Sequence, residues 1–412
     1  MYWAYLSLKI RMGSAMSWSE LLMPNYGTPS VTFVKGSGTE LFDKDGKRYL
    51  DFLCGIAVTG LGHSHPRIAD AISEQANTLL HVSNLFITEP QLEVAETLDR
   101  LIGKGNSQSG KILFQNSGAE ANEAAMKLAR KYQGLGKHGV VSAYKSFHGR
   151  TLATLAATGQ PEKHEPFAPL PEGFRHAEWN NLDSFEEAID QTTGAILVEP
   201  IQGEGGVNDA GSDFLQGLRK LCDEKGLLLI LDEIQTGLGR TGEWFGFHHA
   251  GIKPDIVTVA KGIANGVPIG AVWAKLEVAN AFQPGDHGST FAGQPLAASA
   301  ARETLRVLEE IKAPKLAKEK GAEMVSVITN IDGVNSVRGL GLLLGVEIEK
   351  DRLIHGDARD LAQACLREGL VVNGVTPTAL RLAPPLTISS EEIIEGAGIL
   401  EKVLKTRKED AL

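Results

Sequence analysis

The chain has 412 residues, of which 42% are hydrophobic and 22% charged, and its formal net charge is -10. This length is enough for two or three domains of roughly 150 residues each. The acidic balance argues against a general binder of nucleic acid or of acidic membranes, so an anionic ligand would need local arginines.

Cysteine usage predicts a cytoplasmic protein. Cys54, Cys222 and Cys365 are scattered and form no CxxC pattern, which is typical of reduced thiols. No apolar run approaches the ~20 residues of a transmembrane helix. Residues 1–15 do not resemble the rest of the chain, and we expect them to form a loose extension. Their basic residues follow the apolar ones, which is the reverse of the order in a signal peptide. Met12 and Met16 are alternative starting residues.

The next segments have plain structural interpretations. Residues 17–26 predict a helix, and 39–52 predict a hairpin whose turn contains Asp45-Gly46. The same turn resembles the start of a calcium loop, but it lacks the twelfth-position Glu and the flanking helices. His63 and His65 lie in a loop without further ligands at metal spacing, so no metal site is expected. Helices are expected from Pro66 and over 93–102.

Two continuous apolar runs end in charged residues. Leu227–Leu231 precedes Asp232, and 255–260 precedes Lys261. Continuous runs predict strands that are buried on both faces, and ligands of open α/β sheets lie at the carboxyl ends of strands. A carboxylate and a lysine at two such ends suit pyridoxal phosphate, with the lysine in a Schiff base and the acid on the pyridinium nitrogen. Taken alone, Lys261 would more often be a solvated lysine, and Asp232 a turn or cap residue.

Residues 111–124 predict a strand, a tight turn and a helix. Ser117 and Glu120 fit a capping box. The unpaired N–H groups at the start of this helix also suit a phosphate, and Gly118 and Ala119 are small enough for a phosphate to reach the backbone.

Two further loops carry candidate binding groups. Phe147 and Arg150 follow a strand at 140–142, and either could be an ordinary core or surface residue. Functionally, the ring can stack on a planar ligand and the guanidinium can bind a carboxylate. A third buried strand over 194–201 leads into a flexible loop. The GxGxxG pattern at 237–242 neither follows a strand directly nor opens a helix, so we reject a dinucleotide site there.

The pattern of predicted elements changes in the last third of the chain. We expect a strand after a turn at 266–269, a polar loop at 287–291 and a long helix over 295–311. Beyond about 315, charged helices alternate with short strands, one over 338–345 and an edge strand at 380–385 that its prolines break. The expected division is an extension (1–15), an N-terminal segment joining the small domain (16–60), a large ligand-binding domain (61–300) and a C-terminal small domain (301–412).

Together these segments resemble the class III aminotransferases, of fold type I among pyridoxal phosphate enzymes, from about residue 25 to about residue 400. The resemblance implies an α/β protein with a large, mixed, mostly parallel sheet domain covered by helices, and a smaller α+β domain. Each motif is weak or moderate alone, but all stand in the family's order and spacing: 25–29, 116–123, 147–151, 199–206, 231–235, 260–262, 288–291 and 381–386.

The resemblance also implies residue roles. Lys261 would carry the Schiff base of pyridoxal 5′-phosphate, and Asp232 would bind the pyridine nitrogen. Other cofactor-binding positions would be Ser117, Gly118, Ala119, Phe147, Glu233, Ile234, Gln235 and Thr290, with Phe147 stacked on the ring and Gln235 at its hydroxyl. Substrate-binding positions would be Arg150, Glu204, Ser289 and Arg381. Ala119 stands where relatives commonly have Thr, which puts one hydroxyl contact in doubt.

In the family, Thr290 would reach the phosphate of the neighbouring subunit, which implies a homodimer with shared active sites. Glu204 would pair with Arg381 for one substrate and release it for the other. The implied reaction converts N2-acetyl-L-ornithine and 2-oxoglutarate to N-acetyl-L-glutamate 5-semialdehyde and L-glutamate, in arginine biosynthesis. Succinylornithine, ornithine, 4-aminobutyrate and succinyl-diaminopimelate remain alternative donors. A non-catalytic cofactor-binding protein is a second class, which the retained Lys261, Asp232, Arg150 and Arg381 oppose.

Overall fold

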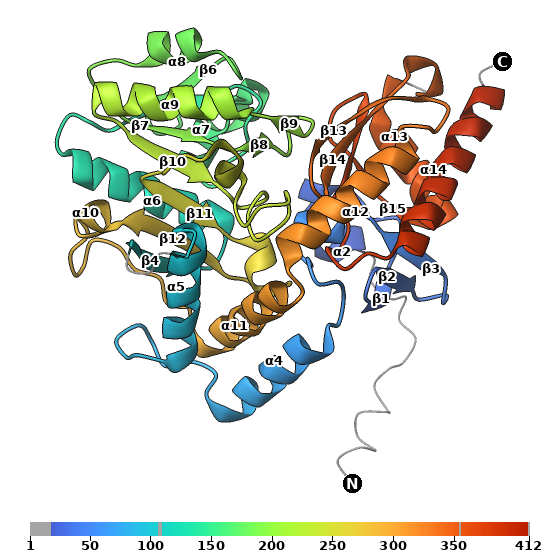
Figure 1. Cartoon of the computed structure of the whole chain (residues 1–412), viewed down its shortest axis with the longest axis horizontal. Coiled ribbons are helices and arrows are strands. Elements are labelled where there is room, and N and C mark those ends of the chain that lie inside the picture. Colours follow the sequence, from blue (N-terminus) through green and yellow to red (C-terminus); the bar gives the residue numbers. More distant parts are fainter. Residues whose placement is uncertain (1–17, 106–108, 354–355, 411–412) are drawn as a thin grey trace.

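The computed structural model describes residues 18–105, 109–353 and 356–410, so the expected extension at 1–15 lies outside the described residues. Its centre is a seven-stranded sheet in the order β4-β12-β11-β10-β7-β5-β6 (Figure 1). Only β12 runs against its neighbours; the other strands are parallel to one another. The strands are β4 Gly110–Gln115, β5 Gly139–Ala143, β6 Phe174–Ala177, β7 Thr193–Val198, β10 Leu228–Asp232, β11 Ile256–Val259 and β12 Gly270–Lys275.

Both predicted apolar strands are confirmed as β10 and β11, and every residue of each is buried. Leu228 and Ile230 face a core that they share with the alanine-rich face of α6 (Gly118–Gln133). Leu229 and Leu231 face the larger core on the opposite side, where α9 (Ser212–Lys225) packs. Helices on both faces explain why the run is continuously apolar instead of alternating.

The predicted N-terminal hairpin is confirmed as β2 (Glu40–Asp43) and β3 (Arg48–Asp51). With β1 (Phe33–Ser37) and β15 (Leu370–Val371) they form a four-stranded sheet in which β3 and β15 are parallel. This sheet therefore joins the two ends of the sequence, as the neighbouring blue and red segments of Figure 1 show. The short helices α2 (Trp18–Leu21), η1 (Pro24–Tyr26) and α3 (Cys54–Ala57) flank it in sequence.

The C-terminal sheet corrects two expectations. Residues 338–345, expected as one strand, contain the turn between β13 (Val334–Leu340) and β14 (Leu343–Ile348), and Gly341 there has a φ of 57°. The expected edge strand is β17 (Ala379–Leu382), which is interior because it lies between β14 and β16 (Asn373–Gly374). The prolines at 384–385 follow the strand instead of interrupting its ladder. Three helices cover this region: α12 Ala313–Ile328, α13 Ala358–Glu368 and α14 Ser390–Asp410.

Helix α11 (Pro295–Glu310) packs against α4 (Pro66–Thr78), α5 (Glu89–Ile102) and the one-turn helix η5 (Lys261–Ala264). A domain boundary near 300 would fall inside α11, and the division at 60 and 300 stays a proposal.

In the part of the chain that the structure describes, no helix qualifies as a membrane span. The remaining elements are α7 Leu152–Ala157, α8 Leu182–Ala188, α10 Leu276–Ala279, β8 Ile201–Gln202, β9 Asn208–Asp209, η2 Pro161–Lys163, η3 Glu165–Phe167, η4 Gly246–Ala250 and η6 Lys350–Arg352.

Candidate active site

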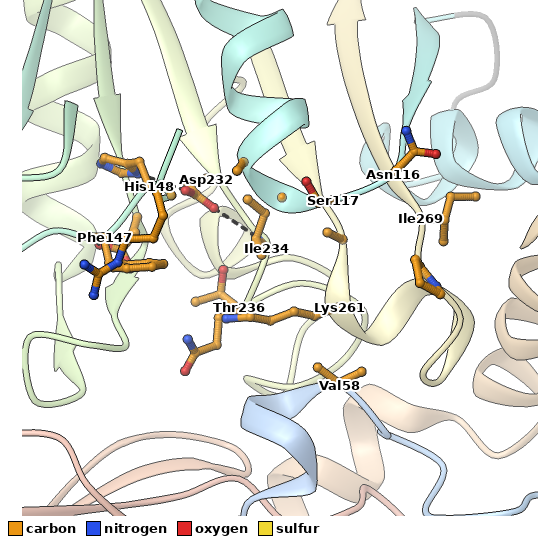
Figure 2. Close-up of a pocket in the computed structure, with 18 of the residues that line it drawn as sticks. Val58, Asn116, Ser117, Phe147, His148, Asp232, Ile234, Thr236, Lys261 and Ile269 are labelled. Atoms are coloured by element: carbon orange, nitrogen blue, oxygen red, sulfur yellow. Dashed lines mark hydrogen bonds and ion pairs between the residues drawn. The ribbon is translucent and has the colours of Figure 1, made fainter. Parts of the chain in front are cut away.

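A cavity of about 390 Å³ lies where β10 and β11 end, bordered by the start of α6 and by the loop after β5 (Figure 2). Nine of the sequence-predicted residues line it: Ser117, Gly118, Ala119, Phe147, Arg150, Asp232, Ile234, Gln235 and Lys261. Unpredicted lining residues include Val58, Asn116, His148, Glu199, Thr236 and Ile269. The carboxyl ends of parallel strands thus form the cavity floor, as expected for an open α/β sheet.

Asp232, the last residue of β10, is 4% exposed and fully hydrogen-bonded. Its Oδ2 accepts from Asn122 Nδ2 at 2.7 Å and from His148 Nδ1 at 2.8 Å, and its Oδ1 accepts from the Ile234 backbone N–H at 3.1 Å. Asn122 is itself braced, since its Oδ1 accepts from Thr258 Oγ1 at 2.8 Å. These donors fix the orientation of the carboxylate.

His148 was not predicted from the sequence, although it lies inside the motif that supplied Phe147 and Arg150. It is buried beside Asp232 (Figure 2), and in the described part of the chain its Nε2 has no hydrogen-bond partner. A buried polar atom without a partner is uncommon in folded proteins. The available sequence signal was a histidine within a loop already expected to bind a ligand.

Lys261 begins η5 directly after β11, with a φ of 45°. That left-handed conformation is strained for a lysine and is of the kind found at functional sites. Among the described residues, its Nζ has no hydrogen-bond or ion-pair partner. Burial, together with the positive charge of Arg381, lowers the pKa of Lys261 to about 8. About a tenth of its amine is therefore uncharged at pH 7 and able to attack a carbonyl.

The start of α6 forms another wall of the cavity. Ser117 caps the helix, and its Oγ accepts from the Glu120 backbone N–H at 3.2 Å. The capping box is incomplete, because the Glu120 carboxylate bonds the backbone N–H of Asn116 and not that of Ser117. A Cβ on Gly118 would lie 2.8 Å from the Ile234 side chain, so this close approach requires glycine. The first N–H groups of a 16-residue helix, together with its dipole, suit a phosphate.

Arg381 reaches the site from β17 in the C-terminal sheet. It is 0% exposed and its Nη1 donates both to Glu204 Oε1 and to Gln235 Oε1, the latter at 3.1 Å. Burial disfavours the charged form of Glu204, but the charge and hydrogen bond of Arg381 prevail, so the pKa of Glu204 lies below its usual value. The structure thus pairs the two residues that the resemblance implies should pair.

Glu199, just beyond β7, is a second residue that the sequence did not single out. Its Oε2 accepts from the Phe147 backbone N–H at 3.1 Å. Burial, reinforced by the charge of Asp232, raises the pKa of Glu199 well above its usual range. The cavity wall therefore carries a carboxyl group that favours its neutral form.

Val58 follows the one-turn helix α3, whose residues Cys54 to Ala57 all have positive φ. Only Gly55 adopts this conformation without cost, and a β-branched residue such as Ile56 is strained in it. The strain is thus stored next to the cavity, and the sequence contained no visible signal for it.

Five predicted residues are not among those that line the cavity: Glu204 and Arg381, described above, and Glu233, Ser289 and Thr290. The Glu233 carboxylate is buried away from it and accepts from Thr236 Oγ1 and from the backbone N–H groups of Gly246 and Phe247. Ser289 lies nearby, since its Oγ accepts from Asn116 Nδ2 at 2.8 Å. Thr290 is exposed.

The chemistry of these groups fits a phosphorylated pyridine aldehyde. The start of α6 offers N–H donors for a phosphate, and Asp232 offers a buried carboxylate for a ring N–H. Lys261 offers an aldehyde an amine that is unpaired within the described ranges. Gly118 has no side chain, lines the cavity and is partly exposed, so the backbone at the start of the helix is accessible from the cavity. No group of three metal-ligating side chains is found within the described ranges.

Comparisons with known proteins agree with one another. The profile of the family "Aminotransferase class-III" matches residues 22–404. Acetylornithine aminotransferase of Methanocaldococcus jannaschii is 45% identical over 386 residues, covering 92% of this chain and 94% of its own length. The Aquifex aeolicus protein of the same name is also 45% identical, with 93% and 99% covered.

Solved structures show the same architecture. The ornithine aminotransferase of Toxoplasma gondii superposes with a TM-score of 0.88 at 32% identity, covering 95% of this chain and 94% of that one. N-acetylornithine aminotransferase of Stenotrophomonas maltophilia gives a TM-score of 0.80 at 34% identity, with 93% and 98% covered. The expectation of a fold type I aminotransferase is confirmed.

Proposed function

Because the chain belongs to the class III aminotransferases, which depend on pyridoxal 5′-phosphate, we propose that it transfers the distal amine of N2-acetyl-L-ornithine to 2-oxoglutarate. The products would be N-acetyl-L-glutamate 5-semialdehyde and L-glutamate, a step of arginine biosynthesis. The carrying observation is the unpaired, partly deprotonated amine of Lys261 in one cavity with the fixed carboxylate of Asp232. Relatives named acetylornithine aminotransferase, at 45% identity and near-full coverage, support the choice of donor.

When bound, pyridoxal phosphate supplies an electron sink for the bond-breaking step. Lys261 Nζ would attach the coenzyme and then, displaced by the substrate amine, move a proton from the substrate carbon that bears nitrogen. Asp232 would keep the ring nitrogen protonated, and its donors, Asn122 and His148, would hold it in place. The N–H groups at the start of α6, including those of Gly118 and Ala119, would bind the phosphate. The ring of Phe147 would stack on the coenzyme and Gln235 would bind its hydroxyl.

The two substrates present different charges near the reacting carbon. The donor reacts at its distal amine, with no carboxylate beside it, whereas L-glutamate reacts at a carbon that bears one. Glu204 would neutralise Arg381 while the donor is bound and release it for the carboxylate of the keto acid. Arg150, which has no ion-pair partner among the described residues, would bind the other carboxylate of each substrate.

A homodimer is part of the proposal. Asn84 Nδ2 donates to the backbone oxygens of Ser289 and Ala292, so the loop before α5 adjoins the loop before α11. Together these loops expose six large apolar side chains: Leu79, Leu80, Leu85, Phe86, Ile87 and Phe291. Such a cluster beside the exposed Thr290 supports a subunit interface at the site. Sedimentation should give twice the chain mass, and a monomer that remains fully active would contradict shared sites.

The test is a panel of amine donors with 2-oxoglutarate on coenzyme-loaded protein. N2-acetyl-L-ornithine should have the highest kcat/KM, above succinylornithine, succinyl-diaminopimelate, ornithine and 4-aminobutyrate. A wide lead for ornithine or 4-aminobutyrate would overturn the choice of donor, and no turnover of any amine would favour a non-catalytic cofactor-binding protein.

A further inference from the structure

Two positive charges lie close to the ring of Phe147. The guanidinium of Arg150 lies 5.5 Å from the ring centre, and Nζ of Lys163, at the end of η2, lies 5.9 Å from it. Lys163 donates one hydrogen bond, to the side-chain oxygen of Gln160, and Arg150 makes none. Within the described ranges, neither cation forms an ion pair with a carboxylate.

The missing counter-ion is notable because acidic residues outnumber basic ones in this chain, 51 to 41. Burial and then the charge of Arg150 lower the pKa of Lys163, while Glu162 and Glu204 oppose that change without pairing with it. Two like charges at one ring repel each other. An anion between them would remove this repulsion and supply the absent partner.

A cation–π contact with Phe147 accounts for the position of either cation. This contact does not explain why neither Arg150 nor Lys163 is paired with a carboxylate, because an aromatic ring does not neutralise a charge. Lys163 is only half-buried and Arg150 is exposed, so a ligand anion can reach them. Phe147 and Arg150 also line the cavity that holds Lys261.

We propose that Lys163 joins Arg150 in binding the substrate carboxylate remote from the reacting carbon, and so helps to determine which donors are accepted. This inference rests on the proposed function, because it needs Lys261 as the reacting amine. The carboxylate at Arg150 and Lys163 and the amine at Lys261 would fix the two ends of the donor. Lys163 would therefore favour amines with a distant carboxylate over simple amines of equal length.

The test compares two donors that differ only in this group: N2-acetyl-L-ornithine and N-acetyl-1,4-diaminobutane, which lacks the carboxylate. In Lys163→Gln, KM for the first should rise about tenfold, the effect of losing one charge-assisted hydrogen bond. KM for the second, and kcat for both, should stay within about twofold, as for a removed surface charge. Lys163→Arg should largely restore KM. The matched control is Lys220→Gln on α9, where the lysine is 78% exposed and forms only an i,i+4 pair.

Binding of glutarate, a dicarboxylate that cannot react, gives a readout independent of turnover. Calorimetry on coenzyme-loaded protein should show its Kd rising about tenfold in Lys163→Gln and not in the Lys220 control. The inference is overturned if both donors lose affinity equally, or if neither KM nor the glutarate Kd changes in a variant with wild-type Tm. A wild-type protein that ignores N2-acetyl-L-ornithine but binds glutarate through Lys163 would refute the proposed donor instead.

Discussion

Nη1 of Arg381 donates to Glu204 Oε1 and so joins β17 of the C-terminal sheet to the loop between β8 and β9. Arg381 is completely buried, yet its Nη2 has no hydrogen-bond partner among the residues that the structure describes. A buried guanidinium with one unpaired nitrogen has a strong tendency to bind a further acceptor. Glu204 therefore neutralises the charge of Arg381 but leaves one of its nitrogens without an acceptor. A site that binds a substrate carboxylate only when Glu204 moves away needs such a nitrogen.

Replacing Glu204 with Gln should shift the preference between the two half-reactions. Arg381 would lose its anionic partner and favour substrates with a carboxylate beside the reacting carbon. The ratio of kcat/KM for L-glutamate to that for N2-acetyl-L-ornithine should rise by about 10- to 100-fold, the range of a charge-assisted hydrogen bond. Single-turnover measurements with each amine give this ratio. The control is Glu347→Gln, which removes the 2.8 Å ion pair with Arg338 in the same sheet; an equal shift there, or none in Glu204→Gln, would refute the switch.

The lowered pKa of Lys261 predicts how the coenzyme attaches. Only the uncharged amine attacks an aldehyde, and the pKa is about 8 instead of its usual 10.5. The rate at which apo-protein combines with pyridoxal phosphate should thus rise about tenfold per pH unit below 8 and level off above it. Stopped-flow absorbance would measure this profile.

Two variants serve as controls for this pH profile. Lys261→Ala should show neither the visible absorbance of attached coenzyme nor its fixation by borohydride, and it should lose catalysis. Arg381→Met removes the charge that, after burial, contributes most to lowering the pKa of Lys261, so its plateau should begin at higher pH. A wild-type rate still rising at pH 10 would show that the amine is not perturbed.

The sequence predicted the residues whose signal is local. Continuous apolar runs located β10 and β11, and therefore Asp232 and Lys261 at their ends. A strand, a turn and a helix in succession located Ser117 and Gly118. These features depend on the periodicity and caps of one segment, which a sequence shows directly.

The residues that escaped prediction depend on tertiary contacts. Asn122 lies one turn inside α6 and Glu199 follows a buried strand, and only the folded sheet brings them to Asp232 and to the Phe147 loop. The prediction of a single strand over 338–345 was wrong for the same reason, because the turn within it depends on a tertiary contact. Gly341 turns the chain where α12 passes so closely that a Cβ on Gly321 would meet the Gly341 oxygen at 2.0 Å. The residues of this segment alone do not indicate that α12 lies so close to Gly341.

Gly118→Ala should weaken coenzyme binding through packing alone. Its Cβ would lie 2.8 Å from Ile234 Cδ1 and 3.0 Å from Cγ2, so the helix start or the loop after β10 must move. Overpacking of this kind costs about 1–3 kcal/mol. We expect a lower Tm and a higher Kd for pyridoxal phosphate. Adding Ile234→Ala removes the contacting atoms and should recover most of both losses. Failure of the double variant to recover would mean that Gly118 is required for its backbone conformation instead.

Glu199→Gln should stabilise the apo-protein, and increasingly so as pH rises. The pKa of Glu199 is raised in the folded state, chiefly by burial, so between its unfolded and folded pKa values the native protein holds a proton that the unfolded chain has lost. Stability contributed by this group is therefore present at low pH and declines as pH increases, by at most about 1.4 kcal/mol per unit. Gln is neutral at every pH, keeps an acceptor for the Phe147 N–H and removes that decline. Urea unfolding at pH 5 and pH 7.5 should show near-equal stability at the lower pH and a more stable variant at the higher one. If the difference in free energy of unfolding between the two proteins were the same at both pH values, Glu199 would be ionised in the native state. That result would contradict a neutral carboxyl group at the cavity wall.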